Sequence, residues 1–186
     1  MPMDTYSNRA SSLFTTFTTV LFVVATLNHL TSYFHSSSPV ATIGVPRVSS
    51  IEYSEFKPFQ ADQVKFEFDL SVDLSTEYNW NVNQLYVFVV ASYETTKNKK
   101  NEVVVFDKIL RDVKDFKFKL SNAKNKYMLR DEFKGTLAGK KISLSVRYQV
   151  MPIFGLLKII NLPATGSFTV PGSYTVETAT KAGNKR

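Results

Sequence analysis

The chain has 186 residues, a formal net charge of +7 and no cysteine. This length allows one globular domain plus an appendage, and the lack of cysteine excludes disulfides, thiolate metal sites and a cysteine nucleophile. The hydrophobic content of 44% and the aromatic content of 13% are typical of a folded core and argue against disorder.

The amino-terminal region contains an uncharged apolar segment. Residues 1–12 are polar, whereas residues 13–34 contain no Asp, Glu, Lys or Arg. Residues 13–30 would span roughly 27 Å as an α-helix at ~1.5 Å per residue, which matches the thin hydrocarbon core of an endoplasmic reticulum bilayer. Threonines fit such a helix because a hydroxyl can bond back to the preceding turn. We predict a cytosolic amino terminus over 1–12 and a retained transmembrane signal anchor over 13–34.

Two other interpretations compete for this segment. A cleaved signal peptide also begins with a basic residue and an apolar run, and the chain would then be a secreted β protein. The candidate small-residue site at Ser36 and Ser38 is followed by Pro39, which is unfavourable after a scissile bond, and the apolar run is long for a signal. A buried core helix would segregate its polar positions on one face, and this segment does not.

Charges beside the span give its expected orientation. Arg9 and the free amino group favour a cytosolic amino terminus, whereas Arg47 beyond the far end acts weakly in the opposite sense. The sequence therefore favours a single-pass type II protein with its body in the lumen. Asn28 and His29 near the far end of the span are expected at the membrane interface, although polar residues in a span can also mark a partner.

The clearest strand pattern covers residues 64–74. Apolar residues occupy every second position and polar or charged residues lie between them, so the strand has one apolar face and one solvated face. The apolar positions are Val64, Phe66, Phe68, Leu70, Val72 and Leu74. Residues 85–90 are almost entirely apolar, which is typical of a strand covered on both faces. We expect these two strands to define the sheet core on which the later strands pack.

The rest of the chain alternates short strand patterns with turn signals. A linker is expected over 35–41 and a hairpin tip over the charged residues 97–101, and residues 121–130 could form one or two helical turns. Further strands are expected at 42–56 (interrupted by Pro46), 102–110, 116–120, 142–150, 168–170 and 174–176. This succession predicts an all-β fold, an antiparallel β-sandwich over residues 35–186.

The sequence offers little enzyme chemistry. Both histidines, His29 and His35, lie in or beside the apolar segment, so the body cannot contain a Ser-His-Asp triad. A Ser-Lys pair needs a desolvated lysine with a lowered pKa, and the lysines here occupy solvated strand positions. No phosphate-binding loop or dinucleotide fingerprint is present. We expect no catalytic residue, cofactor or metal, and we interpret the spread-out lysines as a solvated surface with no nucleic-acid partner.

The central strands also carry a family resemblance. The segments VKFEFDLSVDLSTEYNWNVNQLYVFVVASYET, EVVVFDKIL, LSVRYQVMPIFGLL and FTVPGSYTV resemble, in this order, the family of signal peptidase complex subunit 3. The block Asn79-Trp80-Asn81 is its most specific part. Phe106 stands where that family usually has tryptophan, while Asp107 and the following Lys-Ile agree with it.

The resemblance implies a type II subunit of the endoplasmic reticulum membrane with a lumenal β domain and no catalytic role. Its partners would be the catalytic signal peptidase subunit, which supplies the serine and histidine, and the other membrane subunits. It would support the removal of signal peptides from nascent proteins. The alternative is a stand-alone membrane-anchored β-sandwich binding module. The candidate structural or partner-contact residues are Asn79, Trp80, Asn81, Phe106 and Asp107, with Trp80 expected to be a buried turn anchor or a partner contact.

Overall fold

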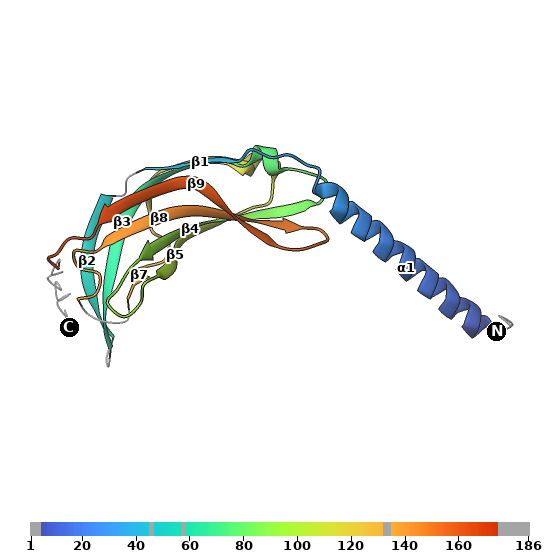
Figure 1. Cartoon of the computed structure of the whole chain (residues 1–186), viewed down its shortest axis with the longest axis horizontal. Coiled ribbons are helices and arrows are strands. Elements are labelled where there is room, and N and C mark those ends of the chain that lie inside the picture. Colours follow the sequence, from blue (N-terminus) through green and yellow to red (C-terminus); the bar gives the residue numbers. More distant parts are fainter. Residues whose placement is uncertain (1–4, 45–46, 57–58, 132–134, 175–186) are drawn as a thin grey trace, which may run out of the picture.

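The protein is described by a computed structural model over residues 5–44, 47–56, 59–131 and 135–174. One amino-terminal helix, α1 (Tyr6–Ser32), extends away from an arched β body (Figure 1). Every strand pair in the body is antiparallel. The predicted fold class, an all-β domain with one amino-terminal apolar helix, is therefore confirmed.

The outer layer of the arch is built around one long strand. Sheet A contains β1 (Val40–Ile43), β2 (Arg47–Phe56), β3 (Phe59–Asp73), β6 (Lys117–Lys124) and β7 (Leu129–Arg130). Strands β1 and β2 follow one another along one edge of β3, with Ile43 opposite Leu70 and Arg47 opposite Glu67. Strands β6 and β7 follow the other edge. The interruption predicted within 42–56 is thus the break between β1 and β2; Pro46 itself lies outside the described residues.

The inner layer is sheet B, with strand order β5 (Asn101–Leu110), β4 (Val82–Tyr93), β8 (Lys141–Pro152) and β9 (Lys158–Thr169). The two strands predicted to form the central pair, β3 and β4, therefore lie in different sheets. Their connection, which contains the short 3-10 helix η1 (Ser75–Glu77), crosses from one layer to the other. The hairpin tip predicted at 97–101 joins β4 to β5.

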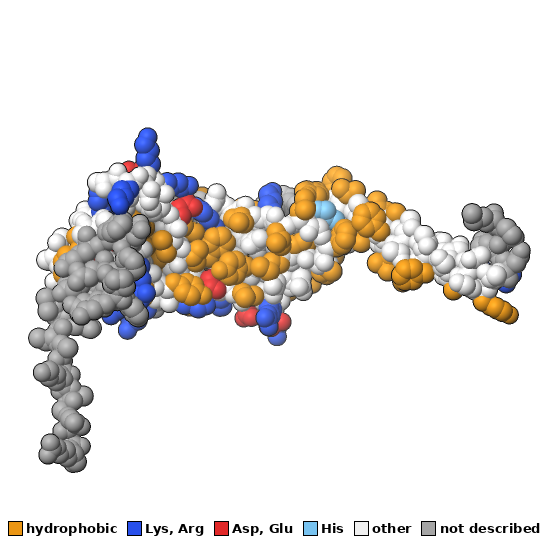
Figure 2. Space-filling model, turned by 90° about the horizontal axis from the view of Figure 1, so that it is seen from below, with side chains coloured by type: hydrophobic (Ala, Val, Ile, Leu, Met, Phe, Trp, Pro, Cys, Tyr) orange, Lys and Arg blue, Asp and Glu red, His pale blue; other side chains and the backbone are white. Residues whose placement is uncertain are grey.

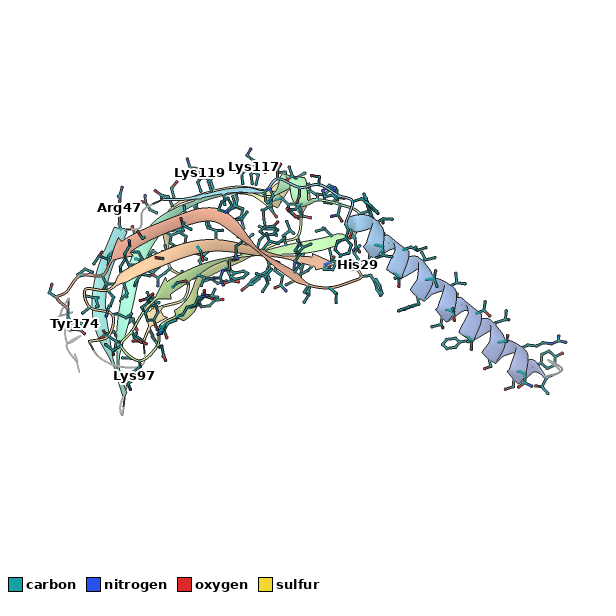
Figure 3. The ribbon with its side chains drawn as sticks, in the orientation of Figure 1. His29, Arg47, Lys97, Lys117, Lys119 and Tyr174 are labelled. Atoms are coloured by element: carbon teal, nitrogen blue, oxygen red, sulfur yellow. The ribbon has the colours of Figure 1, made fainter. Side chains whose placement is uncertain are left out.

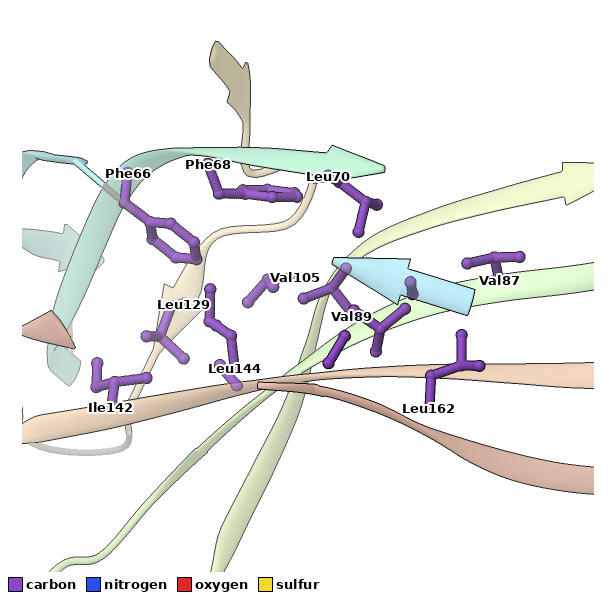
Figure 4. Packing of buried hydrophobic residues seen from close by; sticks show 14 of the residues in the cluster. Phe66, Phe68, Leu70, Val87, Val89, Val105, Leu129, Ile142, Leu144 and Leu162 are labelled. Atoms are coloured by element: carbon purple, nitrogen blue, oxygen red, sulfur yellow. The ribbon is translucent and has the colours of Figure 1, made fainter. Parts of the chain in front are cut away.

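The core lies between the two sheets. All six apolar positions predicted over residues 64–74 are at most 2% exposed, and side chains of β3 meet those of β4 and β8 from sheet B (Figure 4). The ring of Phe66 lies 5.0 Å from that of Phe168 on β9. One alternating strand in sheet A thus supplies much of the apolar surface that sheet B covers, which is the main stabilising contribution expected of a sandwich.

The helical turns considered for residues 121–130 are wrong. Strand β6 runs to Lys124 and β7 follows at Leu129–Arg130. Between them, the side chain of Asn125 accepts a hydrogen bond from the backbone N–H of Phe66 at 3.0 Å and donates one to the carbonyl of Tyr127 at 2.9 Å. The open edge of β3 recruits this segment, because edge N–H and C=O groups need partners.

Helix α1 satisfies its own polar groups. Thr5 caps its start by accepting a hydrogen bond from the N–H of Asn8. Threonine hydroxyls at five positions donate to the carbonyl four residues earlier, at 2.8 to 2.9 Å: Thr15, Thr16, Thr18, Thr19 and Thr26. The most apolar 18-residue stretch of α1 has a mean hydropathy of 1.7, and none of its residues is buried against the body. The helix is long and apolar enough to cross a membrane.

Candidate functional site

Three segments that are distant in sequence converge where α1 meets the body (Figure 1). They are the last two turns of α1, the connection over residues 78–82 before β4, and the loop between β8 and β9 over residues 153–157. We call this region the junction. A pocket of about 200 Å³ lies within it.

Asn81 is the central residue of the junction and is only 2% exposed. Its backbone carbonyl accepts a hydrogen bond from the N–H of Ile153 at 2.7 Å. Its side-chain amide donates to the carbonyl of Phe154 at 2.9 Å and accepts from the N–H of Phe154 at 3.2 Å. The same amide oxygen accepts from Nδ2 of Asn28 on α1 at 3.1 Å. One buried asparagine therefore joins the helix and the β8–β9 loop to the start of β4.

The neighbouring asparagine shapes the turn that presents Asn81. Oδ1 of Asn79 accepts a hydrogen bond from the N–H of Asn81 at 2.9 Å, an arrangement in which an asparagine side chain fixes its own turn. The two predicted asparagines thus have contacts within the chain. Their contact with a partner stays a prediction.

Gly155 allows α1 to approach the β8–β9 loop closely. Its φ of +127° lies in a region that side chains rarely adopt, and a Cβ at this position would collide with the imidazole of His29. The His29 ring lies edge-on to Tyr33 with centroids 5.2 Å apart, and Phe22, two turns earlier on α1, meets Phe154 with ring centroids 6.4 Å apart. The helix and the loop therefore touch along about two helical turns.

The linker after α1 is also held. Nε2 of His35 lies 2.8 Å from the carbonyl oxygen of Thr76, and Oγ1 of Thr76 accepts a hydrogen bond from the N–H of Ser38 at 3.2 Å. Glu77 beside them is buried and accepts a hydrogen bond from the Tyr148 hydroxyl at 2.8 Å. Burial and this bond to Glu77 raise the pKa of Tyr148 above its ordinary value. The Glu77 carboxylate, which lines the pocket, is thus held by Tyr148.

Trp80 differs from the asparagines that flank it. The structure leaves 56% of Trp80 exposed, so the indole is not the buried anchor considered from the sequence. A large exposed aromatic at the membrane-proximal end of the body suits a contact surface. That role for Trp80 stays a prediction.

Trp80→Ala should leave the folding stability of the body almost unchanged, within about 0.5 kcal/mol, because surface substitutions away from packed features have small effects. Thermal unfolding of the full chain in detergent, followed by circular dichroism, measures this. Phe66→Ala, which truncates a core ring, is the control and should cost roughly 3–5 kcal/mol. A loss of similar size for Trp80→Ala would mean that its exposed position is wrong.

The other predicted pair lies on β5, away from the junction. The partly buried ring of Phe106 packs edge-on against Phe68, with centroids 5.7 Å apart. Asp107 accepts a hydrogen bond from Lys126 at 2.7 Å. Burial raises the pKa of Asp107, but its hydrogen bonds with Lys126 and Tyr127 outweigh this and leave the pKa below the usual value. Both side chains therefore tie β5 to the sheet A edge.

The outer face of sheet B forms the inside of the arch. Tyr86 and Phe88 on β4 stack there with ring centroids 5.2 Å apart, and Val104 and Ile109 on β5 are exposed beside them. Figure 2 shows this side of the body, with apolar side chains gathered over its middle. Arg47, Lys117 and Lys119 lie on the opposite, convex side (Figure 3). The inside of the arch thus carries an exposed group of apolar and aromatic side chains.

A bidentate ion pair joins β5 to β8 across β4. Arg147 donates to both carboxylate oxygens of Glu102, at 2.8 and 3.0 Å. Arg147 and then Lys100 lower the pKa of Glu102 to about 2. A carboxyl whose pKa is lowered by folding stabilises the fold above its unfolded pKa and loses that contribution as the pH falls through the folded value.

Glu102→Gln should therefore reduce stability at neutral pH and flatten the decline of stability between about pH 4.5 and pH 2. Urea unfolding midpoints of both proteins across this range measure the effect. If the urea midpoints of the original chain and of Glu102→Gln differ by the same amount at pH 7 and at pH 2, this expectation is contradicted.

Within the ranges that the structure describes, no three His, Asp or Glu side chains are placed to hold a metal ion. In the same ranges no lysine is buried, so the structure places no desolvated lysine beside a serine there. Asp69 and Asp73 on the solvated face of β3 have structural contacts instead, with the N–H of Asn122 at 2.7 Å and with Lys117 at 2.9 Å.

Sequence reasoning missed Asn28, Phe154 and Gly155 as parts of the junction. The sequence predicts Asn28 at the membrane interface or at a partner contact, and not against the body. Phe154 and Gly155 were quoted only within the family resemblance. An isolated glycine between apolar residues, three residues after Pro152, is a turn signal that could have drawn attention to this loop.

Together these features define a class of protein: a β-sandwich body fixed at one end to a single apolar helix, with a concave apolar face and no recognisable catalytic cluster in the described residues. Residues 3–173 match the family described as "Signal peptidase subunit". The chain belongs to this family.

Curated relatives cover almost the whole chain. "Adipocyte-related X-chromosome expressed sequence 1" of Mus musculus is 32% identical over 95% of this chain and 99% of its own length. "Signal peptidase complex subunit 3" of Gallus gallus is 31% identical over 95% of this chain and 98% of its own length. The protein of the same name from Homo sapiens is 28% identical over 94% and 98%. The resemblance inferred from sequence segments is thus confirmed.

Proposed function

We propose that the chain is a non-catalytic subunit of the signal peptidase complex. Helix α1 anchors it in the endoplasmic reticulum membrane, and the β body supports the catalytic subunit while signal peptides are removed from nascent proteins. Membership of the signal peptidase subunit family carries this proposal. The absence of histidine from residues 36–186 agrees with a partner that supplies the catalytic chemistry.

The junction gives this subunit a mechanical role. A body joined to its anchor by a flexible linker could adopt many heights and tilts above the bilayer. Here Asn81, Gly155 and the linker contacts hold the body against the last turns of α1. A partner bound to the body would therefore be held at a set height over the membrane, where the cleavage site of a signal peptide emerges.

The concave face of sheet B is the surface proposed for that partner. It combines the stacked rings of Tyr86 and Phe88 with the exposed Val104 and Ile109, and apolar and aromatic side chains are typical of the centre of a stable interface. Tyr86→Ala combined with Ile109→Asp should weaken co-purification of the catalytic subunit. Lys117→Ala with Lys119→Ala on the convex side is the matched control and should leave it unchanged.

Orientation can be tested at the far end of the body, where Lys97 lies remote from α1 (Figure 3). The chain has no Asn-x-Ser/Thr sequon, and Lys100→Thr creates one at the exposed Asn98. With the body in the lumen, microsomes should glycosylate this variant, and the added mass should be removed by an endoglycosidase.

Asn98→Gln in the same background removes the acceptor and should abolish the mass shift. An unglycosylated Lys100→Thr chain that is degraded by protease outside sealed microsomes would place the body in the cytosol and would contradict the proposed type II orientation.

A further inference from the structure

The loop between β8 and β9 exposes an unusual number of large apolar side chains. Ile153, Leu156 and Leu157 are 69%, 77% and 62% exposed. The loop contains no charged residue; the first one is Lys158 at the start of β9. Such a loop would be unfavourable in water, since apolar surface on a soluble protein is normally dispersed.

Contacts with α1 fix the depth of this loop. Phe154 meets the ring of Phe22, and Phe22 precedes the helix end at Ser32 by ten residues, or roughly 15 Å at ~1.5 Å per residue. Phe22 lies in the middle of the apolar segment 13–30. A loop that touches Phe22 must therefore lie below the membrane surface wherever that segment occupies the hydrocarbon.

Aromatic and basic side chains lie on the segments that meet at the junction. Tyr33 and Lys158 line its pocket together with Leu156 of the loop, and Tyr78 and Trp80 stand on the connection before β4. Tyr33, Tyr78 and Trp80 are all more than half exposed. Tyrosine and tryptophan favour the level of the lipid headgroups, and a lysine such as Lys158 can extend its ammonium to the phosphates. The junction thus combines an apolar loop with aromatic and basic side chains, the residue types that favour the hydrocarbon and the headgroup level of a bilayer.

We propose that the β8–β9 loop inserts into the same leaflet as the end of α1 and gives the body a second membrane contact, with lipid acyl chains around Ile153, Leu156 and Leu157. This inference rests on the membrane anchoring by α1 proposed above. A single helix can tilt in the bilayer and tilt the attached body with it. Two contacts on one leaflet fix its tilt, so the concave face keeps one orientation towards the membrane.

Tryptophan quenching by brominated lipids tests this insertion, because Trp80 is the only tryptophan in the chain. In a Trp80→Phe background, single tryptophans are placed by Leu156→Trp in the loop, Leu21→Trp in α1 and Lys97→Trp at the far end of the body. The full chains are reconstituted in phosphatidylcholine vesicles whose acyl chains are brominated near the headgroup or near the terminal methyl.

Leu156→Trp should lose at least half as much fluorescence as Leu21→Trp in these vesicles, and Lys97→Trp should lose almost none. Ile153→Trp is a second loop variant and should behave as Leu156→Trp does. Quenching of Leu21→Trp with no quenching at either loop position would overturn the inference while leaving the anchor intact. No quenching at Leu21→Trp would instead contradict the membrane span.

The same variants measured in the purified complex distinguish lipid from a protein neighbour. Retained quenching at Leu156→Trp supports lipid as the occupant. Loss of this quenching in the complex, with Leu21→Trp still quenched, would mean that another subunit covers the loop and would overturn the lipid assignment.

Discussion

Asp62→Ala should destabilise the β body by about 3 kcal/mol or more, which is a large fraction of the stability of a domain of this size. Asp62 is fully buried. Its carboxylate accepts hydrogen bonds from the N–H groups of Gly135 and Leu137 at 3.0 and 2.9 Å and from the Tyr174 hydroxyl at 2.8 Å. Alanine leaves these three donors without an acceptor, and each buried unpaired group costs ~1–3 kcal/mol.

Urea unfolding of the full chain in detergent, followed by the circular dichroism of its strands, measures this loss. Asp112→Ala is the matched control: it removes an exposed carboxylate that makes no helix-capping bond, and its effect should stay within about 0.5 kcal/mol. Asp62→Asn keeps one acceptor oxygen and should fall between the two. Equal unfolding midpoints for Asp62→Ala and Asp112→Ala would show that this carboxylate does not hold residues 135–137 and Tyr174.

Gly155→Val should impair the function of the complex more strongly than the folding of the body. A β-branched residue at a φ of +127° costs of order 1–3 kcal/mol in backbone strain, and the collision with His29 adds to it. The contact between α1 and the β8–β9 loop should then open, so that the body loses its set height. We expect signal-peptide cleavage to fall by about 10-fold or more, equivalent to ~1.4 kcal/mol, when this chain limits the complex.

Two control variants separate the collision from the strain. Gly139→Val also places a β-branched residue at a positive φ, +71°, but with no atom within 4 Å of the new Cβ, and it should leave cleavage largely intact. Combining Gly155→Ala with His29→Ala removes the collision, and the pair should be more active than Gly155→Ala alone. Cleavage at the normal rate by Gly155→Val would show that the close helix–loop approach has no role in function.

The sequence predicts the local elements of this fold well because they depend on short-range periodicity. The alternation over 64–74 correctly gives both the strand and its buried face. The same alternation could have revealed Asp62, which lies two residues before Val64 on the apolar face of β3, where an unpaired carboxylate would not be tolerated. Its partners, at residues 135–137 and 174, are too far along the chain for any local pattern to show them.

The predictions that were wrong or incomplete also depend on contacts between residues distant in sequence. The tendency of residues 121–130 to form turns is overridden by the free edge of β3, a feature of tertiary structure. The block Asn79–Asn81 could be recognised as special from its sequence, but the partners of Asn81 are Asn28 and Phe154, which are 53 and 73 residues away. The exposure of Trp80 likewise follows from the geometry of the junction and not from its polar neighbours.

The central claim, that this chain is a non-catalytic subunit on which signal peptidase depends, is tested most directly by depleting it and re-expressing it with an affinity tag. The rate of signal-peptide cleavage in the resulting microsomes is measured, together with the proteins that co-purify with the tag. We predict that depletion slows cleavage, that the tagged chain restores it, and that a catalytic serine protease subunit co-purifies. Normal cleavage in depleted microsomes, with no protease subunit on the purified chain, would contradict the account.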